Sequence, residues 1–489
     1  MPRLVALGDS LAQGVSSGAV WKTGWSFPAM VARAMGLRVG TGEGFDFSVP
    51  HFGLGGMPLN LERLLRDLDF TLGGPGLDLV DWLLAARPAV EEWLEERDEY
   101  YEHGFGALAR SYGGPYHLLA CFGFTVEDLF TVNGSRCDRL IRERRWDDRS
   151  EFMEKFPSSA AYRAARRVLN PAARHELNDL TQVDWLGRIE ELQGPIENLI
   201  LVAGLNNAAG VVTRLEVVET GPEPPEPDLV EEFSLWHPRA FEASYRRLAE
   251  RVSDKTNARV FAATLPYVTD APLIRGAGPR NHGPRSEHHE YYVHFYLRDD
   301  DPSRERFDFL SAEEVLRVEE CQDAYNETIR SVARERGWRV VDLAGLLNGL
   351  VGRGEYTPDA HLRRFLGDEN HPLLKLQPPP RMELFRSDAG GRRTGGGLVS
   401  LDCFHGTVTG FALVAELFIR ALLEEGVEFR DASGKPLPPE GVRLPWERVT
   451  AVDQLLVNPP RLWADLLRAG EHLGKIWERV GGVISLFHA

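Results

Sequence analysis

The chain has 489 residues, of which 43% are hydrophobic and 26% are charged, and its formal net charge is −17 at pH 7. This length exceeds the ~250–300 residues at which a single core usually stops growing, which predicts large insertions or a second domain. The acidic balance disfavours nucleic acid as a partner, because phosphate binding needs clustered basic charge, and no apolar run approaches the ~20 residues of a membrane span.

The first apolar run begins at Leu4. The basic region and apolar core that mark a secretory signal peptide do not precede it. The four cysteines have no C-x-x-C spacing, which is typical of a reducing compartment rather than of a disulfide scaffold. We therefore expect a cytoplasmic protein without a transmembrane segment.

Apolar runs alternate with amphipathic segments along the chain. Strands are expected at residues 4–7, in a run that ends before Gly123, from residue 198 to Gly204, at 259–266 and at 339–343. Helices are expected at residues 25–35, 60–68, 239–253, 312–337 and 411–419. This alternation is the signature of an α/β protein with a parallel sheet of about five strands and helices on both faces.

Long irregular or helical stretches interrupt this pattern. We expect insertions near residues 40–115, 133–190, 268–311 and 352–397, the second of them helical and the last a flexible loop rich in glycine and proline. We interpret residues 1–429 as one domain with these insertions. Residues 430–489 have apolar side chains at helical spacing and are expected to form an extension that packs on the domain.

Two short motifs, far apart in the sequence, carry the chemistry. Ser10 follows the first strand, and at the carboxyl end of a strand in an open α/β sheet a side chain points into the crevice where ligands bind. A serine after Gly-Asp is also a common helix N-cap, so its meaning depends on the second motif. There, Asp402 stands three residues before His405, so its carboxylate can fix the imidazole at Nδ1 and leave Nε2 to take a proton from a hydroxyl.

The Gly-Asp-Ser-Leu sequence at residues 8–11, together with the Asp402–His405 unit, resembles the GDSL family of serine esterases, also called SGNH hydrolases. The resemblance implies a flavodoxin-like, three-layer α/β/α fold. It also implies that Ser10 is the nucleophile, that His405 is the general base and that Asp402 orients His405.

The same resemblance implies an oxyanion hole formed by the backbone N–H of Ser10, the backbone N–H of Gly123 and the side-chain amide of Asn206. Gly123 ends an apolar run, and Asn206 lies in the Gly-x-Asn that the family uses. The chain departs from the family pattern at Asn207, where an Asp is usual, and at Gly406, where a Pro is usual. Neither change removes a group that the chemistry needs.

These residues together predict an ester hydrolase, similar to carboxylesterases and lipases, that acts on a small-molecule ester through an acyl-enzyme and needs no metal or other cofactor. Aromatic and apolar residues at 21–52 and 295–309 favour an acyl chain or an aromatic group in the substrate. Two alternatives stay open: a carbohydrate O-deacetylase of the same family, and a binding module that keeps the hydrolase fold without catalysis.

Two further patterns compete with this interpretation. Ser16 lies in a G-x-S-x-G sequence, but the preceding strand ends at Leu7, so no strand feeds directly into the motif to make the strained turn that it requires. Four histidines fall between His282 and His294. His289 and His294 are five residues apart and do not share a helix face, which favours an exposed or aromatic-packed loop over a metal site.

Overall fold

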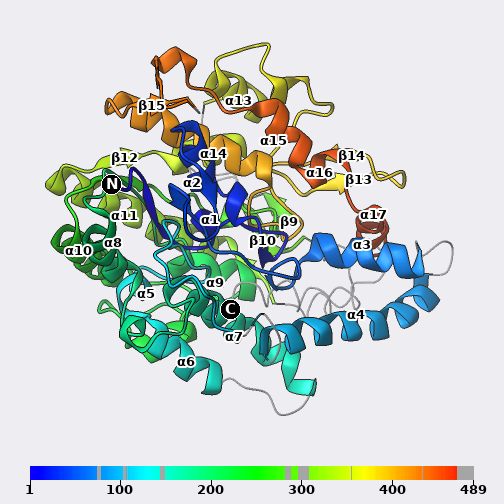
Figure 1. Ribbon diagram of the computed structural model, residues 1–489. Helices are drawn as coiled ribbons and strands as arrows, with labels where there is room; N and C mark the ends of the chain where they lie inside the picture. Colours follow the sequence, from blue (N-terminus) through cyan, green and yellow to red (C-terminus); the bar gives the residue numbers. More distant parts are fainter. Residues whose placement is uncertain are drawn as a thin grey trace.

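The computed structural model describes residues 1–73, 79–102, 106, 108–143, 149–280, 288–295, 308–353, 355–431 and 433–470. Within them, four parallel strands form a sheet in the order β1-β7-β8-β12. Figure 1 labels its last strand, β12. The strands are β1 (Val5–Gly8), β7 (Asn198–Val202), β8 (Arg259–Ala263) and β12 (Arg339–Val341). This sheet and its helices confirm the predicted α/β class.

The expected fifth strand, before Gly123, is reduced to a short pairing with β1. Leu118 forms a parallel bridge with Ala6, and the N–H of Leu119 donates to the Ala6 carbonyl at 2.9 Å. The N–H groups of His117 and Leu118 both turn to the carbonyl of Ser48 instead. Two further backbone bonds, from the N–H of Ala6 to His117 at 2.9 Å and from the N–H of Cys121 to Gly8 at 3.0 Å, keep the segment along β1 as it runs toward Gly123.

The side chains of the strands alternate between two cores, one on each face of the sheet. Leu7 and Leu199 belong to the first core, whereas Ala6 and Ile200 belong to the second. The first core takes in α8 (Gln182–Gln193), α10 (Pro238–Lys255) and α11 (Ala312–Arg336), and the second takes in α2 (Phe27–Ala34), α12 (Leu343–Leu350) and α14 (Val408–Glu424). Burial on both faces explains why the strands are continuous apolar runs.

The long helices begin and end at the signals that the sequence carries. In α11, Ser311 and Glu314 form a capping box, and Gly337 ends the helix in the left-handed conformation with φ +68°. In α2, the hydroxyl of Ser26 accepts from the N–H of Ala29, and Pro28 lies in the first turn. These local signals are the reason that the predicted and observed ranges agree closely.

The first two insertions are mainly helical. The first contains α3 (Leu61–Leu72) and α4 (Leu79–Glu102), with the short strands β2 (Val15–Ser16), β3 (Ala19–Val20) and β6 (Met57–Pro58) forming a small antiparallel sheet beside it. A parallel pair, β4 (Val39–Gly40) with β5 (Phe47–Ser48), lies between β3 and β6 in the sequence. The second insertion contains α6 (Gly134–Glu143) and α7 (Arg149–Leu169), as expected for residues 133–190, and follows α5 (Asp128–Thr131).

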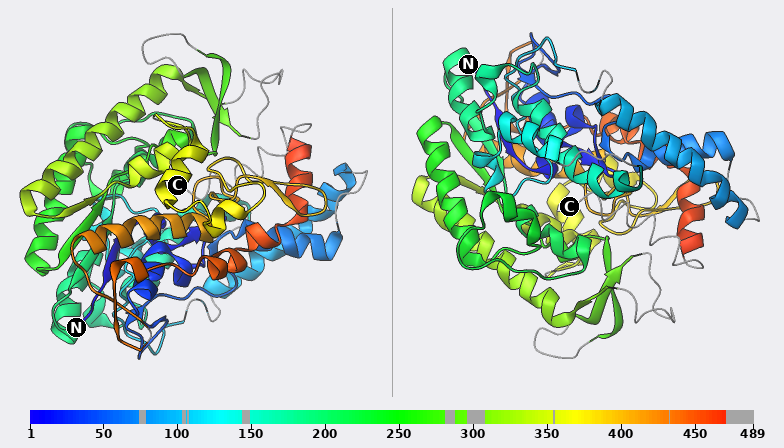
Figure 2. Two further views of the ribbon diagram at one scale, coloured as in Figure 1. Left: turned by 90° about the horizontal axis from the view of Figure 1, so that it is seen from above. Right: turned by 90° about the horizontal axis from the view of Figure 1, so that it is seen from below.

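The third and fourth insertions are more regular than the sequence suggested. Residues 268–311 contain the antiparallel strands β9 (Ile274–Arg280), β10 (His289–His294) and β11 (Leu310–Ser311), which project from one side of the molecule (Figure 2). Residues 352–397 are not simply a loop, because α13 (Pro358–Leu366) and the strands β13 (Arg386–Ser387) and β14 (Arg393–Gly395) lie within them. The hydroxyl of Thr357 caps α13, and Pro358 occupies its first position.

The described part of the carboxyl-terminal segment packs on the rest of the protein. It contains β15 (Phe429–Arg430), β16 (Pro436–Leu437), α15 (Trp446–Val452), α16 (Gln454–Val457) and α17 (Arg461–Gly470). Trp446 is buried in the second core and Trp463 in the first. Figure 2 shows α17 next to α3, which it contacts. No helix in the described ranges is both long and apolar enough to cross a membrane.

Candidate active site

Ser10 is held at the point where β1 ends and α1 (Ser10–Gln13) begins. Gly8 has φ +151°, and a Cβ atom there would lie 2.2 Å from the carbonyl oxygen of Val202 on the neighbouring strand. The side-chain amide of Gln182 pairs with both backbone groups of Gly8, accepting from its N–H and donating to its carbonyl at 3.1 Å each. The backbone before the serine is therefore fixed from two sides, and Ser10 itself is buried, with 4% of its surface exposed.

Asp9 brings the surrounding segments together. Its carboxylate is fully buried and accepts from the N–H of Leu11 at 3.1 Å, while the N–H of Leu205 also faces it. Burial raises the pKa of Asp9 to about 7, against the opposing effects of these N–H groups and of the nearby His405 ring. The carboxyl group thus lies between the helix that carries Ser10, the turn before Asn206 and the imidazole of His405.

Asp402 and His405 form a buried pair on one tight loop before α14. The Asp402 Oδ2 atom lies 3.1 Å from Nδ1 of His405, and its Oδ1 atom accepts from the backbone N–H of His405 at 2.8 Å. Asp402 is fully buried, and His405 is 3% exposed. Cys403, between them, has φ +61°, a strained value for a residue other than glycine, so the surrounding loop must hold this conformation. With Nδ1 donating to the carboxylate, Nε2 is the basic nitrogen.

A second turn of the chain supports Asp402 from the opposite side. The N–H of Gly18, between β2 and β3, donates to Oδ2 of Asp402 at 2.7 Å. The hydroxyl of Ser400 accepts from the N–H of Ser17 at 2.7 Å and donates to Oδ1 of Asp402 at 3.1 Å. Within residues 14–18, which resemble a nucleophile motif in the sequence, the backbone N–H groups of Ser17 and Gly18 therefore hold the acid, whereas Ser16 does not contact it. Ser16 lies buried on β2, in a hairpin rather than in a strand-to-helix turn.

Asn206 lies against the turn that contains Gly123. It opens α9 (Asn206–Arg214), and its Nδ2 donates to the carbonyl of Phe124 at 2.9 Å. This bond uses one of the two hydrogens of the amide, so the other is available to a ligand. Gly123 is exposed and has φ +79°. Gln13 joins this turn to α1, because its Oε1 accepts from the N–H of Phe122 at 2.8 Å.

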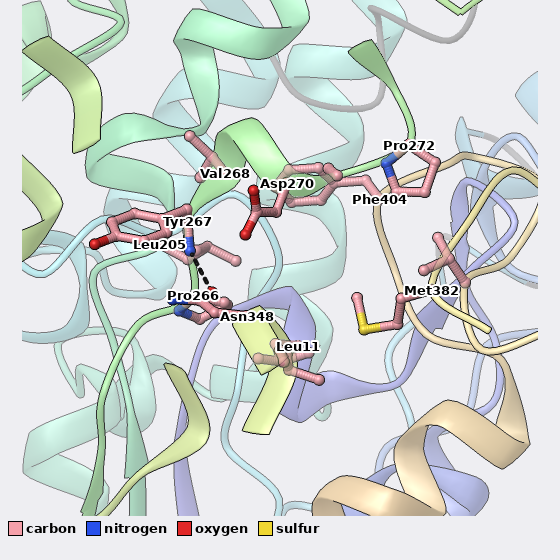
Figure 3. A pocket seen from close by; sticks show the side chains of 13 residues that line it. Leu11, Leu205, Pro266, Tyr267, Val268, Asp270, Pro272, Asn348, Met382 and Phe404 are labelled. Carbon is pink, nitrogen blue, oxygen red and sulfur yellow. Dashed lines mark hydrogen bonds between the residues drawn. The ribbon is translucent and has the colours of Figure 1, made fainter. Parts of the chain in front are cut away.

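A pocket of about 50 Å³ opens beside these residues (Figure 3). Three of the residues that line it, Leu11, Leu205 and Phe404, are direct chain neighbours of Ser10, Asn206 and His405. Its other lining residues are mostly apolar: Pro266, Tyr267, Val268, Asp270, Ala271, Pro272, Leu347, Asn348, Met382 and Val399. The pocket therefore lies next to the predicted site, although none of the predicted site residues lines it.

The histidines between 282 and 294 are held by separate contacts. His282 lies outside the described residues. The Nε2 atom of His288 is 3.4 Å from Glu319, whereas His294 is buried, with its Nε2 atom 3.1 Å from the carbonyl oxygen of Val212. Over the described ranges, no group of three or more histidine, cysteine, aspartate or glutamate side chains is arranged to hold a metal ion.

Comparison of the chain with models of protein families, with curated proteins and with solved structures finds no match. The geometry itself joins residues that the sequence separates. Asp402 and His405 are in contact, Asn206 lies on the Gly123 turn, and Asp9 connects these parts to Ser10. The catalytic roles of these residues stay a prediction.

Sequence reasoning missed the residues that support the site. The N-cap of α1 is Asp9 rather than Ser10, and nothing in the sequence indicated that its carboxylate lies near His405. The contacts of Gln182 and Ser400 span 174 and 383 residues of chain, so no local signal could identify them.

Proposed function

We propose that the protein is a serine ester hydrolase of the GDSL/SGNH type that acts on a small-molecule ester. The observation that supports this most directly is the buried hydrogen bond of 3.1 Å between Asp402 and Nδ1 of His405, whose ring lies near the carboxylate of Asp9, the residue before Ser10. We further propose that the central sheet and the helices on its two faces are the three-layer core of that family.

In the proposed reaction, Nε2 of His405 takes the proton of Ser10 as its Oγ attacks the ester carbonyl. Asp402 stabilises the imidazolium that forms, and its several hydrogen bonds fix its orientation. His405 then gives the proton to the leaving alcohol. Attack by water on the acyl-enzyme, with the same histidine as base, releases the acid and restores Ser10.

Negative charge develops on the former carbonyl oxygen during both steps. The proposed donors to it are the backbone N–H groups of Ser10 and Gly123 and the second amide hydrogen of Asn206. Donors of this kind act most strongly where they are fixed in advance. The bond from Asn206 to the Phe124 carbonyl supports this role because it fixes the amide next to Gly123.

The pocket favours substrates with a short group. Its volume of about 50 Å³ is well below the ~150 Å³ of an apolar cavity that accommodates benzene. A short acyl or alcohol part is therefore preferred to a long fatty chain. For the same reason, removal of acetyl groups from carbohydrates is the second candidate function, and acetylated sugars belong among the substrates to be tested.

The test compares the wild-type protein with Ser10→Ala on p-nitrophenyl esters from acetate to palmitate, and labels both with a serine-reactive phosphonate. We expect hydrolysis of the short esters, labelling of the wild type at Ser10, and loss of both in the variant. Ser16→Ala is the matched control, because its buried Oγ has no hydrogen-bond partner in the described structure. It should keep both activity and labelling.

Hydrolysis that survives in Ser10→Ala, or a phosphonate attached to another residue, would contradict the proposed nucleophile. If the wild-type protein neither hydrolyses an ester nor takes up the phosphonate, the hydrolase proposal fails. The binding module would then be the better interpretation.

A further inference from the structure

One carboxylate lies in the wall of the otherwise apolar pocket. Asp270 follows β8 in a short turn, and its side chain is 11% exposed. Its Oδ1 accepts from Nε of Arg353 at 2.5 Å, whereas Oδ2 is buried without a hydrogen-bond partner among the described residues. Figure 3 shows this carboxylate among the side chains that line the pocket. Because a buried acceptor without a donor is costly, a ligand that supplies a donor there is favoured.

The surroundings of Asp270 favour a positively charged donor. Its partner Arg353 also donates to Glu319 at 2.6 Å, so one guanidinium serves two carboxylates. The pKa of Asp270 is raised to about 6, because burial outweighs the effect of Arg353. Three further titratable side chains lie near this cluster. His288 is next to Glu319, Asp323 accepts from the Tyr267 hydroxyl, and the pKa of Tyr292 is raised by burial and also by the charges of Glu319 and Asp270. A cation at Oδ2 would relieve the unfavourable burial of negative charge.

The rest of the pocket suits the body of a small organic cation. The side chains of Leu11, Leu205 and Met382 offer apolar contact for a short hydrocarbon part. The Phe404 ring offers an aromatic surface, and aromatic rings attract cations electrostatically. The neighbouring Tyr267 ring already holds the guanidinium of Arg353 at 4.7 Å from its centre.

We infer that the pocket selects esters whose short acyl or alcohol part ends in a primary ammonium group, with Asp270 as the residue that binds this group. The assignment of an ester rests on the proposed function, whereas the binding of an ammonium group does not. The net charge of −17 agrees with a cationic substrate, since a negative protein attracts cations from solution.

The kinetic test uses two p-nitrophenyl esters of equal shape, the 3-aminopropanoate and the butanoate, which differ by an ammonium in place of a methyl group. The ratio of their kcat/KM values is compared between wild type and Asp270→Asn, so that intrinsic reactivity cancels. We expect the ratio to fall about 10- to 100-fold in the variant, as for loss of a charged hydrogen bond. Asp323→Asn is the matched control and should keep the wild-type ratio.

The binding test does not depend on turnover, and its first part needs no variant. Propylammonium and 1-propanol are titrated into the wild-type protein by calorimetry, and the same two ligands are then titrated into Asp270→Asn. We expect the wild type to bind propylammonium at least tenfold more tightly than propanol, and the variant to lose this preference. Equal affinity for the two ligands, or an unchanged kinetic ratio in Asp270→Asn, would overturn the inference.

The outcomes separate the two proposals. If the protein binds ammonium through Asp270 but hydrolyses no ester, the hydrolase proposal is wrong and the proposed binding site is supported. If the protein hydrolyses esters without preferring those that carry an ammonium group, the hydrolase proposal is supported and the proposed role of Asp270 is wrong.

Discussion

Asp9 carries a fully buried carboxyl group at the centre of the candidate site. Its N-cap bond to Leu11 favours the ionised form, but burial outweighs this, and its pKa rises from 3.8 to about 7. In the unfolded chain the group loses its proton near pH 4. Between about pH 4 and pH 7, unfolding therefore releases a proton, so the contribution of Asp9 to stability falls as the pH rises.

We predict that Asp9→Asn makes the protein less sensitive to pH in this range. An asparagine can still cap α1 through its carbonyl oxygen but cannot ionise. Relative to wild type, the variant should gain about 3 kcal/mol of stability between pH 5 and pH 8, because the wild type loses about 1.4 kcal/mol for each pH unit from 5 up to the pKa of about 7. Urea unfolding of both proteins at the two pH values measures this difference. If the difference in unfolding free energy between wild type and variant is the same at both pH values, Asp9 does not titrate in this range.

Residues of the candidate site differ in how far the sequence could predict them. The contact of Asp402 with His405 follows from a spacing of three residues on one loop, and the placement of Ser10 follows from the strand before it. The orphaned oxygen of Asp270 and the position of Asp9 near His405 depend on segments more than 80 residues away, such as the Arg353 and Asp402–His405 segments. Contacts between segments so far apart leave no pattern in the local sequence from which they could be predicted.

At the scale of elements, the β2–β3 hairpin is the support for the Asp402–His405 loop. The Ser400 hydroxyl connects the two, because it accepts from the N–H of Ser17 and donates to Asp402. Without this hydroxyl, the N–H of Ser17 stays buried without a partner, and Asp402 loses one of the bonds that fix its orientation. Ser400 is therefore a positioning residue.

We predict that Ser400→Ala lowers kcat for ester hydrolysis about tenfold while KM changes little, and destabilises the fold by about 1–3 kcal/mol through the buried N–H. The pH dependence separates positioning from a merely structural role. A less well-oriented Asp402 stabilises the imidazolium less, so the acidic limb of the kcat/KM profile should move to lower pH. Ser16→Ala, in the same hairpin, should leave the profile in place. A stability loss without any shift of the profile would contradict the positioning role.

The elements that the sequence predicted well are those with local signals. Helix α11 has a capping box at one end and a glycine at the other, and its predicted and observed ranges differ by one residue at most. The sheet β9–β10–β11 was missed because its pairing joins segments that do not meet in a tight turn. Helix α13 was missed because a composition rich in glycine and proline farther along the same stretch concealed the Thr357–Pro358 start signal.

For the whole molecule, the described part of the carboxyl-terminal segment belongs to the same cores as the sheet. The fully buried Asp453 accepts from the N–H of Thr409 at 2.8 Å and so joins α16 to the start of α14. Trp463, on α17, is 1% exposed in the first core, and its indole N–H donates to the carbonyl of Phe385 at 2.9 Å. We therefore expect residues 430–470 to unfold together with the sheet rather than separately.

Trp463→Ala tests this expectation. Removing a buried tryptophan costs about 3–5 kcal/mol, partly through the cavity that it leaves, whereas Val457→Ala at a site 55% exposed should change stability by less than about 0.5 kcal/mol. Hydrogen exchange shows which backbone amides become less protected when the protein is destabilised. If the segment and the sheet form one cooperative unit, the amides of β1 and β7 lose protection to the same extent as those of α16 and α17. Faster exchange confined to α17 and its contact with α3 would mean that the segment opens independently, and that the candidate site does not depend on it.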